Sequence, residues 1–117
     1  MKVKDYKDLN IWQKGIEIAD KIYTISEKFT KSEIFGLAGQ MRRASVSISS
    51  NIAEGFARNH NKEYKQFLYI SLGSCAELDT QVIISRRRGY ITEKELEDLT
   101  EDINHESRML MSLIKKL

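Results

Sequence analysis

No proline occurs anywhere in the 117-residue chain, and glycine occurs only six times. These two residues are the strongest breakers of regular structure, so few positions in the sequence enforce a turn. Apolar residues recur at steps of three and four over long stretches, which is the spacing of one face of a helix. The chain is therefore restricted to a few long helices with short connections.

Four helices are predicted, at residues 8–29, 31–57, 62–88 and 93–117. Helices of this length span about 33 to 40 Å each at the usual rise per residue. Short connections make successive helices antiparallel. We expect one all-α domain over residues 1–117, folded as an antiparallel up-down-up-down four-helix bundle.

The apolar spacing also predicts which face of each helix is buried. In the first helix the largely apolar stripe is Leu9, Trp12, Ile16, Ala19, Tyr23 and Ser26. In the last helix the corresponding stripe is Leu96, Leu99, Ile103, Leu110, Ile114 and Leu117.

Capping patterns predict where the helices begin and end. The S/T-x-x-E pattern of a capping box occurs twice, at Thr30–Glu33 before the second helix and at Thr92–Glu95 before the fourth. Asn61 suits the N-cap of the third helix. Gly89 suits the left-handed position that closes the third helix.

The stretch GLAGQMRRASVSISSNIAEG, residues 36–55, places several serines in the second helix. Its VSIS alternation is not sustained on either side, so a helix is favoured over a strand. Small residues such as Ser45 here, and Ser71, Ser74 and Cys75 in the third helix, allow two backbones to approach closely. Their hydroxyl groups are expected to bond to a carbonyl one turn earlier.

A second apolar edge is present on the two middle helices. A helix that is apolar on more than one side is buried on more than one side, and another copy of the chain is the simplest cover. We therefore expect a homo-oligomer. The candidate interface residues are Val46, Ala53, Leu72, Ala76 and Ile83.

The formal net charge is only +2, but the charges are unevenly distributed along the sequence. Residues 31–90 hold nine Lys/Arg and five Asp/Glu, whereas residues 91–117 hold four and seven. Guanidinium and ammonium groups could hold the phosphates of RNA or DNA, at two opposite ends of the bundle. The candidate nucleic-acid-binding residues are Arg42, Arg58, Lys62, Lys65, Arg86, Arg87 and Arg88.

Each of these charges also has a structural interpretation. The triplet Arg86 to Arg88 could simply complement the negative end of a helix. Arg43 is expected to form a structural ion pair with Glu54 or Glu77, within or between subunits. Tyrosines at helical spacing are more often core or interface residues than base-stacking residues.

Enzymatic chemistry finds little support in the sequence. A single D-x-x-H pair, Asp102 and His105, is too few ligands for a di-iron bundle, so no metal and no cofactor is expected. Cys75 has no positioned histidine, and a mid-helix apolar site would raise its pKa. The chain has neither a predicted membrane span nor an N-terminal signal segment, so we expect a cytoplasmic, non-enzymatic protein without a membrane partner.

Four stretches together resemble a known family: LNIWQKG, GLAGQMRRASVSISSNIAEGFAR, FLYISLGSCAEL and RMLMSLIKKL. The family is the four helix bundle proteins whose first members are encoded in intervening sequences of bacterial 23S ribosomal RNA genes. The matching motif positions are Gln40, Arg42, Arg43, Ala44, Ser47, Asn51, Ile52, Ala53, Glu54, Gly55, Arg58, Gly73, Ser74, Glu77 and Leu78. Thr30 departs from the pattern, which would have a proline there.

The resemblance implies a compact bundle that often assembles as a ring-like pentamer, with no catalytic residues to transfer. A related branch comprises accessory proteins of diversity-generating retroelements, which are similar basic bundles that associate with a reverse transcriptase and nucleic acid. Two functions are therefore expected: an RNA-associated oligomeric module that binds through its basic clusters, or a scaffold that serves a nucleic-acid-processing enzyme without binding nucleic acid itself.

Overall fold

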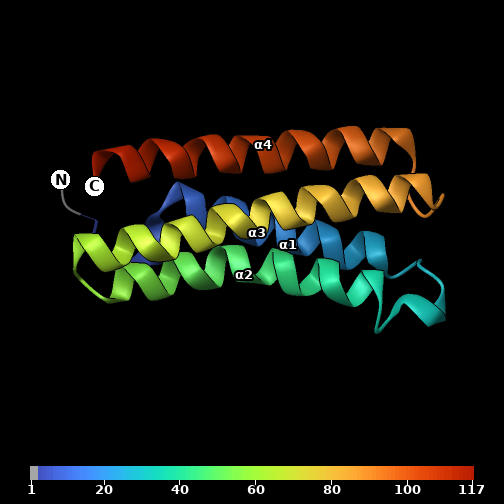
Figure 1. Cartoon of the computed structure of the whole chain (residues 1–117), viewed down its shortest axis with the longest axis horizontal. Coiled ribbons are helices and arrows are strands. Elements are labelled where there is room, and N and C mark those ends of the chain that lie inside the picture. Colours follow the sequence, from blue (N-terminus) through green and yellow to red (C-terminus); the bar gives the residue numbers. More distant parts are fainter. Residues whose placement is uncertain (1–2) are drawn as a thin grey trace.

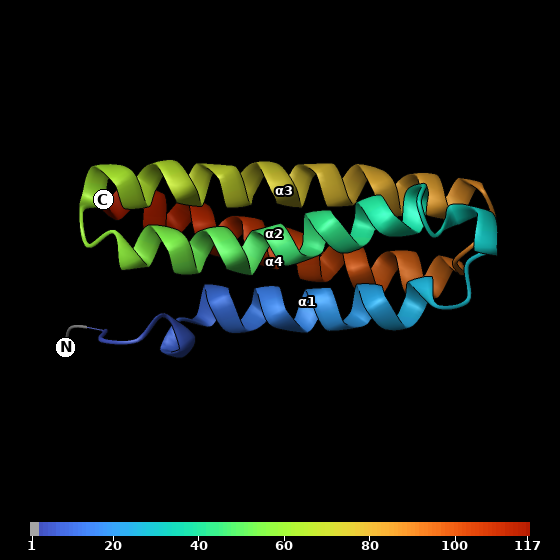
Figure 2. The ribbon, with the colours of Figure 1, turned by 90° about the horizontal axis from the view of Figure 1, so that it is seen from below.

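The computed structural model describes residues 3–117, which are entirely helical apart from their connections. Successive α-helices run in opposite directions and form an elongated bundle of 45 × 24 × 19 Å (Figures 1 and 2). The predicted all-α four-helix bundle is confirmed. The α-helices are α1 (Asn10–Ser26), α2 (Leu37–Ala57), α3 (Asn61–Arg87) and α4 (Glu93–Lys116), with 3₁₀ turns η1 (Tyr6–Asp8) and η2 (Lys31–Glu33).

Each helix packs against two others. α1 and α3 both contact α2 and α4, and within residues 3–117 neither diagonal pair is in contact. The four helices therefore occupy the corners of a square in chain order, so that the side formed by α1 and α2 is opposite the side formed by α3 and α4. The helix labels in Figures 1 and 2 can be followed around this order.

The buried face of α1 differs from the predicted stripe. The residues that reach the core are Ile11, Gly15, Ile18, Ile22 and Ser26. Of the predicted stripe, Ser26 is buried and Leu9 and Trp12 pack against the core. The prediction was wrong for Ile16 and Tyr23, which are 45% and 44% exposed on a second apolar face. Spacing alone cannot rank two apolar faces of one helix, because both satisfy the same period.

The start of α2 also differs from prediction. Residues 31–33 form the short turn η2, and α2 begins at Leu37, after Gly36. The predicted capping box at Thr30 does not form, since the Thr30 side chain caps no backbone N–H. Glu33 instead reaches forward, where it accepts hydrogen bonds from Leu37 N at 3.2 Å and from the hydroxyl of Tyr90 at 2.9 Å.

α1 is shorter than the predicted helix 8–29 by two residues at its start and three at its end. The end of α2 and both ends of α3 and α4 agree with the predictions within a residue. Thr92 and Glu95 form the complete capping box at the start of α4. Gly89 has φ = +76° and closes α3 as predicted. α3 begins at Asn61 with His60 as its N-cap, so the predicted cap is displaced by one residue and makes no side-chain cap bond.

Buried serines connect the helices more than they bond within them. Ser45 Oγ bonds back to the carbonyl of Arg42 at 2.9 Å, as expected for a mid-helix serine. Ser71 Oγ instead donates to the carbonyl of Ile48 at 2.8 Å, and Ser74 Oγ is 2.9 Å from Ser47 Oγ, so both link α3 to α2. The predicted close approach of α2 and α3 is confirmed.

Gly15 allows a similar close approach between α1 and α2. A Cβ atom at position 15 would collide with the hydroxyl of Ser49. In its absence, Ser49 Oγ reaches across and donates to the carbonyl of Trp12 at 3.0 Å. Both buried glycine and buried serine thus serve helix packing.

α3 contains a long apolar stretch. Although no membrane span was predicted, α3 is the one helix among the described residues whose length and hydropathy would suffice to cross a membrane. The core helix of a bundle can have the same properties. Leu68, Cys75, Leu78 and Val82 of α3 are fully buried, and exposed apolar side chains such as Ile83 and Ile84 account for a further part of its apolar character.

Candidate functional site

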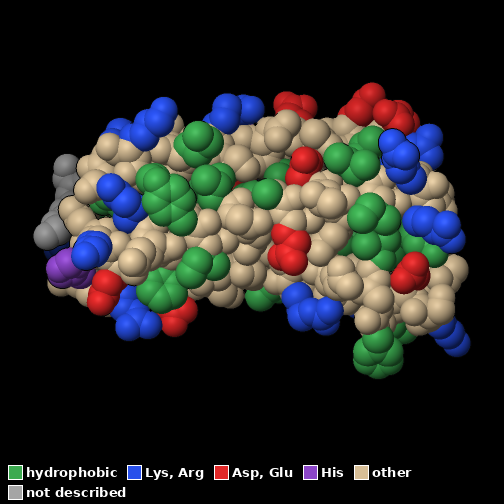
Figure 3. Space-filling view, viewed as in Figure 1, with side chains coloured by type: hydrophobic (Ala, Val, Ile, Leu, Met, Phe, Trp, Pro, Cys, Tyr) green, Lys and Arg blue, Asp and Glu red, His purple; other side chains and the backbone are tan. Residues whose placement is uncertain are grey.

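The two ends of the bundle differ in charge. The terminal end comprises residues 3–9, 54–65 and 108–117, which contain the α2–α3 connection and lie where both chain termini are drawn (Figure 1). The opposite end comprises residues 20–42 and 86–101, which contain the other two connections. The terminal end holds eight Lys/Arg and four Asp/Glu, whereas the opposite end holds eight of each. In Figure 3 basic side chains gather with a histidine at the terminal end, beside the grey atoms.

Ion pairs engage fewer of the basic side chains at the terminal end than at the opposite end. In the described part of the chain, the terminal end contains one ion pair, between Arg58 and Glu54 at 3.6 Å. At the opposite end Lys28 bonds to Glu95 at 2.6 Å and Arg86 to Glu93 at 3.0 Å. Most of the basic side chains at the terminal end are therefore left without a carboxylate partner.

The predicted nucleic-acid-binding residues fall into two groups. α3 is one unbroken helix of 27 residues, so it separates Lys62 and Lys65 at its start from Arg86 to Arg88 at its end by about 35 Å. This confirms that the two clusters lie at opposite ends. The terminal end, which has the excess of basic side chains, carries Arg58, Lys62 and Lys65. The opposite end, where basic and acidic side chains are equal in number, carries Arg86 to Arg88.

Arg42 is occupied by contacts within the bundle. Its Nε donates to Ser26 Oγ at 2.8 Å, and its guanidinium lies 5.1 Å from the ring centre of Tyr23. These contacts join the start of α2 to the end of α1. Arg42 is therefore a packing residue in this chain, which lowers its weight as a candidate for binding phosphate.

The expected ion pair of Arg43 is absent within the chain. Among residues 3–117, Glu54 pairs with Arg58 instead, and Arg43 and Glu77 are not within ion-pair distance although both line one hollow of about 360 Å³. The expectation assumed that these charges are buried. Both side chains are exposed, and solvated charges need no partner.

A half-buried ionic cluster joins α1 to α4. Asp102 accepts from Lys14 at 2.8 Å and from Lys21 at 2.6 Å. Burial alone would raise the pKa of Asp102, but the hydrogen bonds from the two lysines outweigh burial and lower it. The same bonds raise the pKa of both lysines, that of Lys21 well above its usual range.

One turn further along α4, Glu106 is in the opposite situation. Its side chain is fully buried, and within the described residues neither carboxylate oxygen has a hydrogen-bond partner. Burial raises the pKa of Glu106 to about 8, against a smaller lowering by Lys14. The carboxyl group is therefore mostly protonated at neutral pH.

A hollow of about 760 Å³ lies at the terminal end. It lies between the α2–α3 connection and the two ends of the chain. Its lining residues are Val3, Lys4, Leu9, Phe56, Asn59, His60, Asn61, Tyr64, Leu113 and Leu117. A volume of this size is typical of sites for small molecules or parts of larger ligands.

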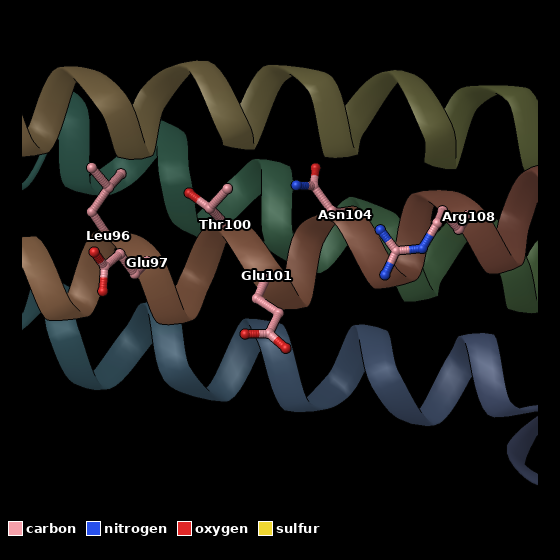
Figure 4. A pocket seen from close by; sticks show the side chains of 6 residues that line it. All are labelled: Leu96, Glu97, Thr100, Glu101, Asn104 and Arg108. Atoms are coloured by element: carbon pink, nitrogen blue, oxygen red, sulfur yellow. The ribbon is translucent and has the colours of Figure 1, made fainter.

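The other hollows are shallow surface features. One of about 410 Å³ is lined by six residues of α4 alone, among them Thr100 and Asn104, which point toward α3, and Glu101, which points toward α1 (Figure 4). Within residues 3–117, no three His, Cys, Asp or Glu side chains are grouped so that they could hold a metal ion. The Cys75 thiol is buried, and burial raises its pKa to about 12.

The predicted interface residues lie on two opposite faces. Val46 is 43% exposed and, with Ala53, lines a groove of about 290 Å³ that Trp12, Ile16 and Ala19 of α1 complete. Ile83, at 44%, lies on the other side of the bundle.

The edge of α3 that carries Ile83 can be placed by its neighbours. Cys75 of α3 lies beside Ser107 of α4, whereas Ser74 bonds to Ser47 of α2. At 100° per residue, Leu72, Ala76 and Ile83 lie on the α4 side of α3. Figure 3 shows hydrophobic side chains scattered over the face that α3 presents.

Two functional features were not found from the sequence. Glu106 occupies the position in the apolar stripe of α4 between Ile103 and Leu110, and the gap of seven residues in the predicted stripe was its signal. No single stretch of the sequence reveals the excess of basic side chains at the terminal end. α4 contributes to this excess only with its last turn, because its first turns are acidic. Only the antiparallel packing brings Lys115 and Lys116 together with Lys62 and Lys65.

Comparison with known proteins supports the fold and a family. A solved structure of a protein of unknown function from the S23 ribosomal protein family of Bacteroides thetaiotaomicron is similar, with a TM-score of 0.83 and 24% sequence identity over 90% of this chain and 98% of that one. No curated protein matches the chain. The model of the 23S rRNA-intervening sequence protein family matches residues 7–112. Because this match spans nearly the whole bundle, the chain belongs to the 23S rRNA-intervening sequence protein family.

Proposed function

We propose that this chain is a non-enzymatic module that associates with further copies of itself and holds the phosphate backbone of nucleic acid, RNA in particular, at its terminal end. The observation that carries the proposal is the imbalance there of eight basic and four acidic side chains. Exposed lysines without carboxylate partners bind phosphate without reading base sequence, by releasing the counterions of the nucleic acid.

Charge distribution favours the terminal end over the arginine triplet. Arg86 is engaged by Glu93, and Arg87 and Arg88 share their end with an equal number of acidic side chains. A nucleic acid approaching that end meets no net positive potential. At the terminal end Lys62, Lys65 and the lysines of the last turn of α4 add to one field.

Self-association is supported by the two apolar faces. The groove between α1 and α2 and the outer edge of α3 are different surfaces on opposite sides of the bundle. Two different surfaces favour head-to-tail contact, which closes into a ring when the rotation between copies permits it. A ring, such as the pentamer that the family resemblance implies, would bring the basic ends of several copies together.

Binding is tested by fluorescence anisotropy of a labelled RNA at 50 and 200 mM salt. We expect affinity to fall at least tenfold between these salts, because each phosphate contact contributes to the slope. Lys62→Gln/Lys65→Gln/Lys115→Gln/Lys116→Gln should lower low-salt affinity by at least tenfold. The matched control, Arg87→Gln/Arg88→Gln, should change it less than about threefold. Equal losses in the two variants would contradict the assignment to the terminal end.

Assembly is tested by native mass spectrometry and light scattering. Val46→Glu and Ile83→Glu should each reduce the assembled mass, since each places a charge on one of the two faces. Ile84→Glu is the control, because Ile84 is equally exposed but lies on another edge of α3. A monomeric wild-type protein would contradict self-association.

The second candidate function is a scaffold or accessory partner of a nucleic-acid-processing enzyme, such as a reverse transcriptase, without direct nucleic-acid binding. The exposed apolar faces favour it, because they suit protein contacts. This function predicts a stable assembly with no RNA affinity even at 50 mM salt.

A further inference from the structure

We propose that the large hollow at the terminal end receives an unpaired base of a single-stranded nucleic acid. The inference rests on the proposed function and specifies which part of the nucleic acid the terminal end recognises. Three independent features of the hollow lead to it: its aromatic and apolar walls, its unused hydrogen-bonding groups, and the lysines around it.

The walls suit the flat faces of a base. Phe56 and Tyr64 meet edge to face, with ring centres 5.9 Å apart and planes at 89°, so the two rings offer differently oriented apolar surfaces. Leu113 and Leu117 of α4 also line the hollow. Stacking of a base on an aromatic side chain stabilises a complex by about 1–3 kcal/mol.

The polar groups of the hollow are available for a base edge. Tyr64 lines the hollow, and its hydroxyl has no exposed surface and, within the described residues, no hydrogen-bond partner. A base gains a bond to this hydroxyl only if the Tyr64 ring moves on binding, and the bond then satisfies a group that is unfavourable when buried alone. Asn59, His60 and Asn61 add two amides and an imidazole, which can donate and accept as base edges require.

The α2–α3 connection presents polar side chains to the hollow. Asn59 has φ = +53°, a left-handed conformation that asparagine tolerates better than most residues. Together with His60 it turns the chain from α2 into α3, and both residues line the hollow.

The basic side chains near the hollow favour an anionic ligand. Lys4 lines it, and Lys62, Lys65, Lys115 and Lys116 lie in the helix turns that supply the lining residues Asn61, Tyr64 and Leu117. An apolar peptide would gain nothing from these lysines. A strand with one base in the hollow would place its flanking phosphates near these lysines.

A duplex cannot use the hollow, because its bases are stacked and paired. We therefore expect a fluorescein-labelled 12-nucleotide oligouridylate to bind at least tenfold more tightly than a labelled 12-base-pair RNA duplex, in anisotropy measurements at 50 mM salt. A duplex that binds as tightly as the single strand would overturn the inference.

Two conservative variants test the hollow directly. His60→Ala removes an exposed ring and Tyr64→Phe removes only the buried hydroxyl, so both should fold, as checked by thermal unfolding. Each should weaken single-strand binding by about threefold to tenfold and leave duplex binding unchanged. His105→Ala, at an exposed histidine of α4 outside the hollow, is the control and should change neither.

A cross-linking readout locates the base. With 4-thiouridine in the oligonucleotide, cross-links mapped by mass spectrometry should fall on Phe56, His60 or Tyr64. Cross-links confined to other residues would overturn the inference.

The outcomes separate this inference from the proposed function. If His60→Ala and Tyr64→Phe are silent while the fourfold lysine variant still weakens binding, the hollow is not a base site and the phosphate contacts stand. If neither RNA binds at 50 mM salt, both proposals fail. If either variant reduces the assembled mass, the hollow is a subunit contact and the inference is overturned.

Discussion

Two successive turns of α4 hold their buried carboxyl groups in opposite ways. The carboxylate of Asp102 accepts from Lys14 and Lys21 of α1. The carboxyl group of Glu106 is buried without a partner among the described residues, as are single polar atoms of Tyr64, Asp79 and Gln81 on α3. Along α4, the change from a satisfied to an unsatisfied carboxyl group lies between Asp102 and Glu106.

This contrast predicts opposite effects on stability. The ion pairs of Asp102 stabilise the packing of α1 against α4, whereas an unsatisfied buried carboxyl group reduces stability. Six substitutions, in four comparisons, can break or sharpen this distinction.

The largest effect is expected at Glu106. Its carboxyl group has an ordinary pKa of 4.5 when unfolded and about 8 when folded, so the free energy of unfolding falls as pH rises from about 4.5 to about 8. Glu106→Gln should remove this slope and stabilise the protein at pH 8 by up to about 5 kcal/mol. Urea unfolding at a series of pH values measures it. An unchanged slope would show that Glu106 is not the unsatisfied group we infer.

The opposite effect is expected at Asp102. Asp102→Ala leaves Lys14 and Lys21 without their shared partner, and the free energy of unfolding at pH 7 should fall by about 2–3 kcal/mol. Because the folded pKa of Asp102 is lowered, the stabilisation is present above the ordinary value of 3.8 and is lost as pH falls through the folded pKa. In the same urea experiment the variant should be less sensitive to acid than the wild type. A loss below 0.5 kcal/mol would indicate a solvent-screened pair.

The two S/T-x-x-E patterns give a smaller, matched comparison. Thr92→Ala should lower the free energy of unfolding by about 1 kcal/mol, because it removes the side-chain bond to Glu95 N. Thr30→Ala should change it by less than about 0.5 kcal/mol, since Thr30 caps no backbone group. Thermal unfolding of both variants measures the difference. Equal losses would mean that Thr30 contributes as a cap after all.

The smallest effects are expected at the two left-handed residues, one at each end of the bundle. Gly89→Ala should cost about 1 kcal/mol, because alanine is strained at φ = +76°. Asn59→Gly, at φ = +53°, should change stability by less than about 0.5 kcal/mol, since asparagine already tolerates this region. Thermal unfolding checks both. A larger gain on Asn59→Gly would reveal strain stored beside the hollow.

Periodicity and capping were sufficient to predict the bundle and most helix ends. The errors have local physical causes. α1 carries two apolar faces, so its period did not identify the one that packs. The capping pattern at Thr30 predicted a helix from residue 31, but α2 begins only after Gly36. Glu33, which lies outside α2, accepts the hydrogen bond from Leu37 N.

The candidate site could be predicted only in part, because charge summed along the sequence is not charge summed in space. α4 was predicted as an acidic element, yet its acidic first half and its basic last turn lie at opposite ends of the molecule. Likewise Arg86 is one of three consecutive arginines, but a residue seven positions later neutralises it. The positions of the charged side chains in three dimensions, rather than their density along the sequence, decide which end of the bundle attracts an anion.

The antiparallel arrangement has a practical consequence for work with this protein. Val3, Lys4 and Leu117 all line the hollow, so an affinity tag or fusion partner at either end of the chain would emerge beside the surface proposed to bind nucleic acid. The α1–α2 connection is at the far end, where Phe35 is 94% exposed. A label inserted there would leave the proposed surface unobstructed, so a tag's position alone could decide whether an assay detects binding.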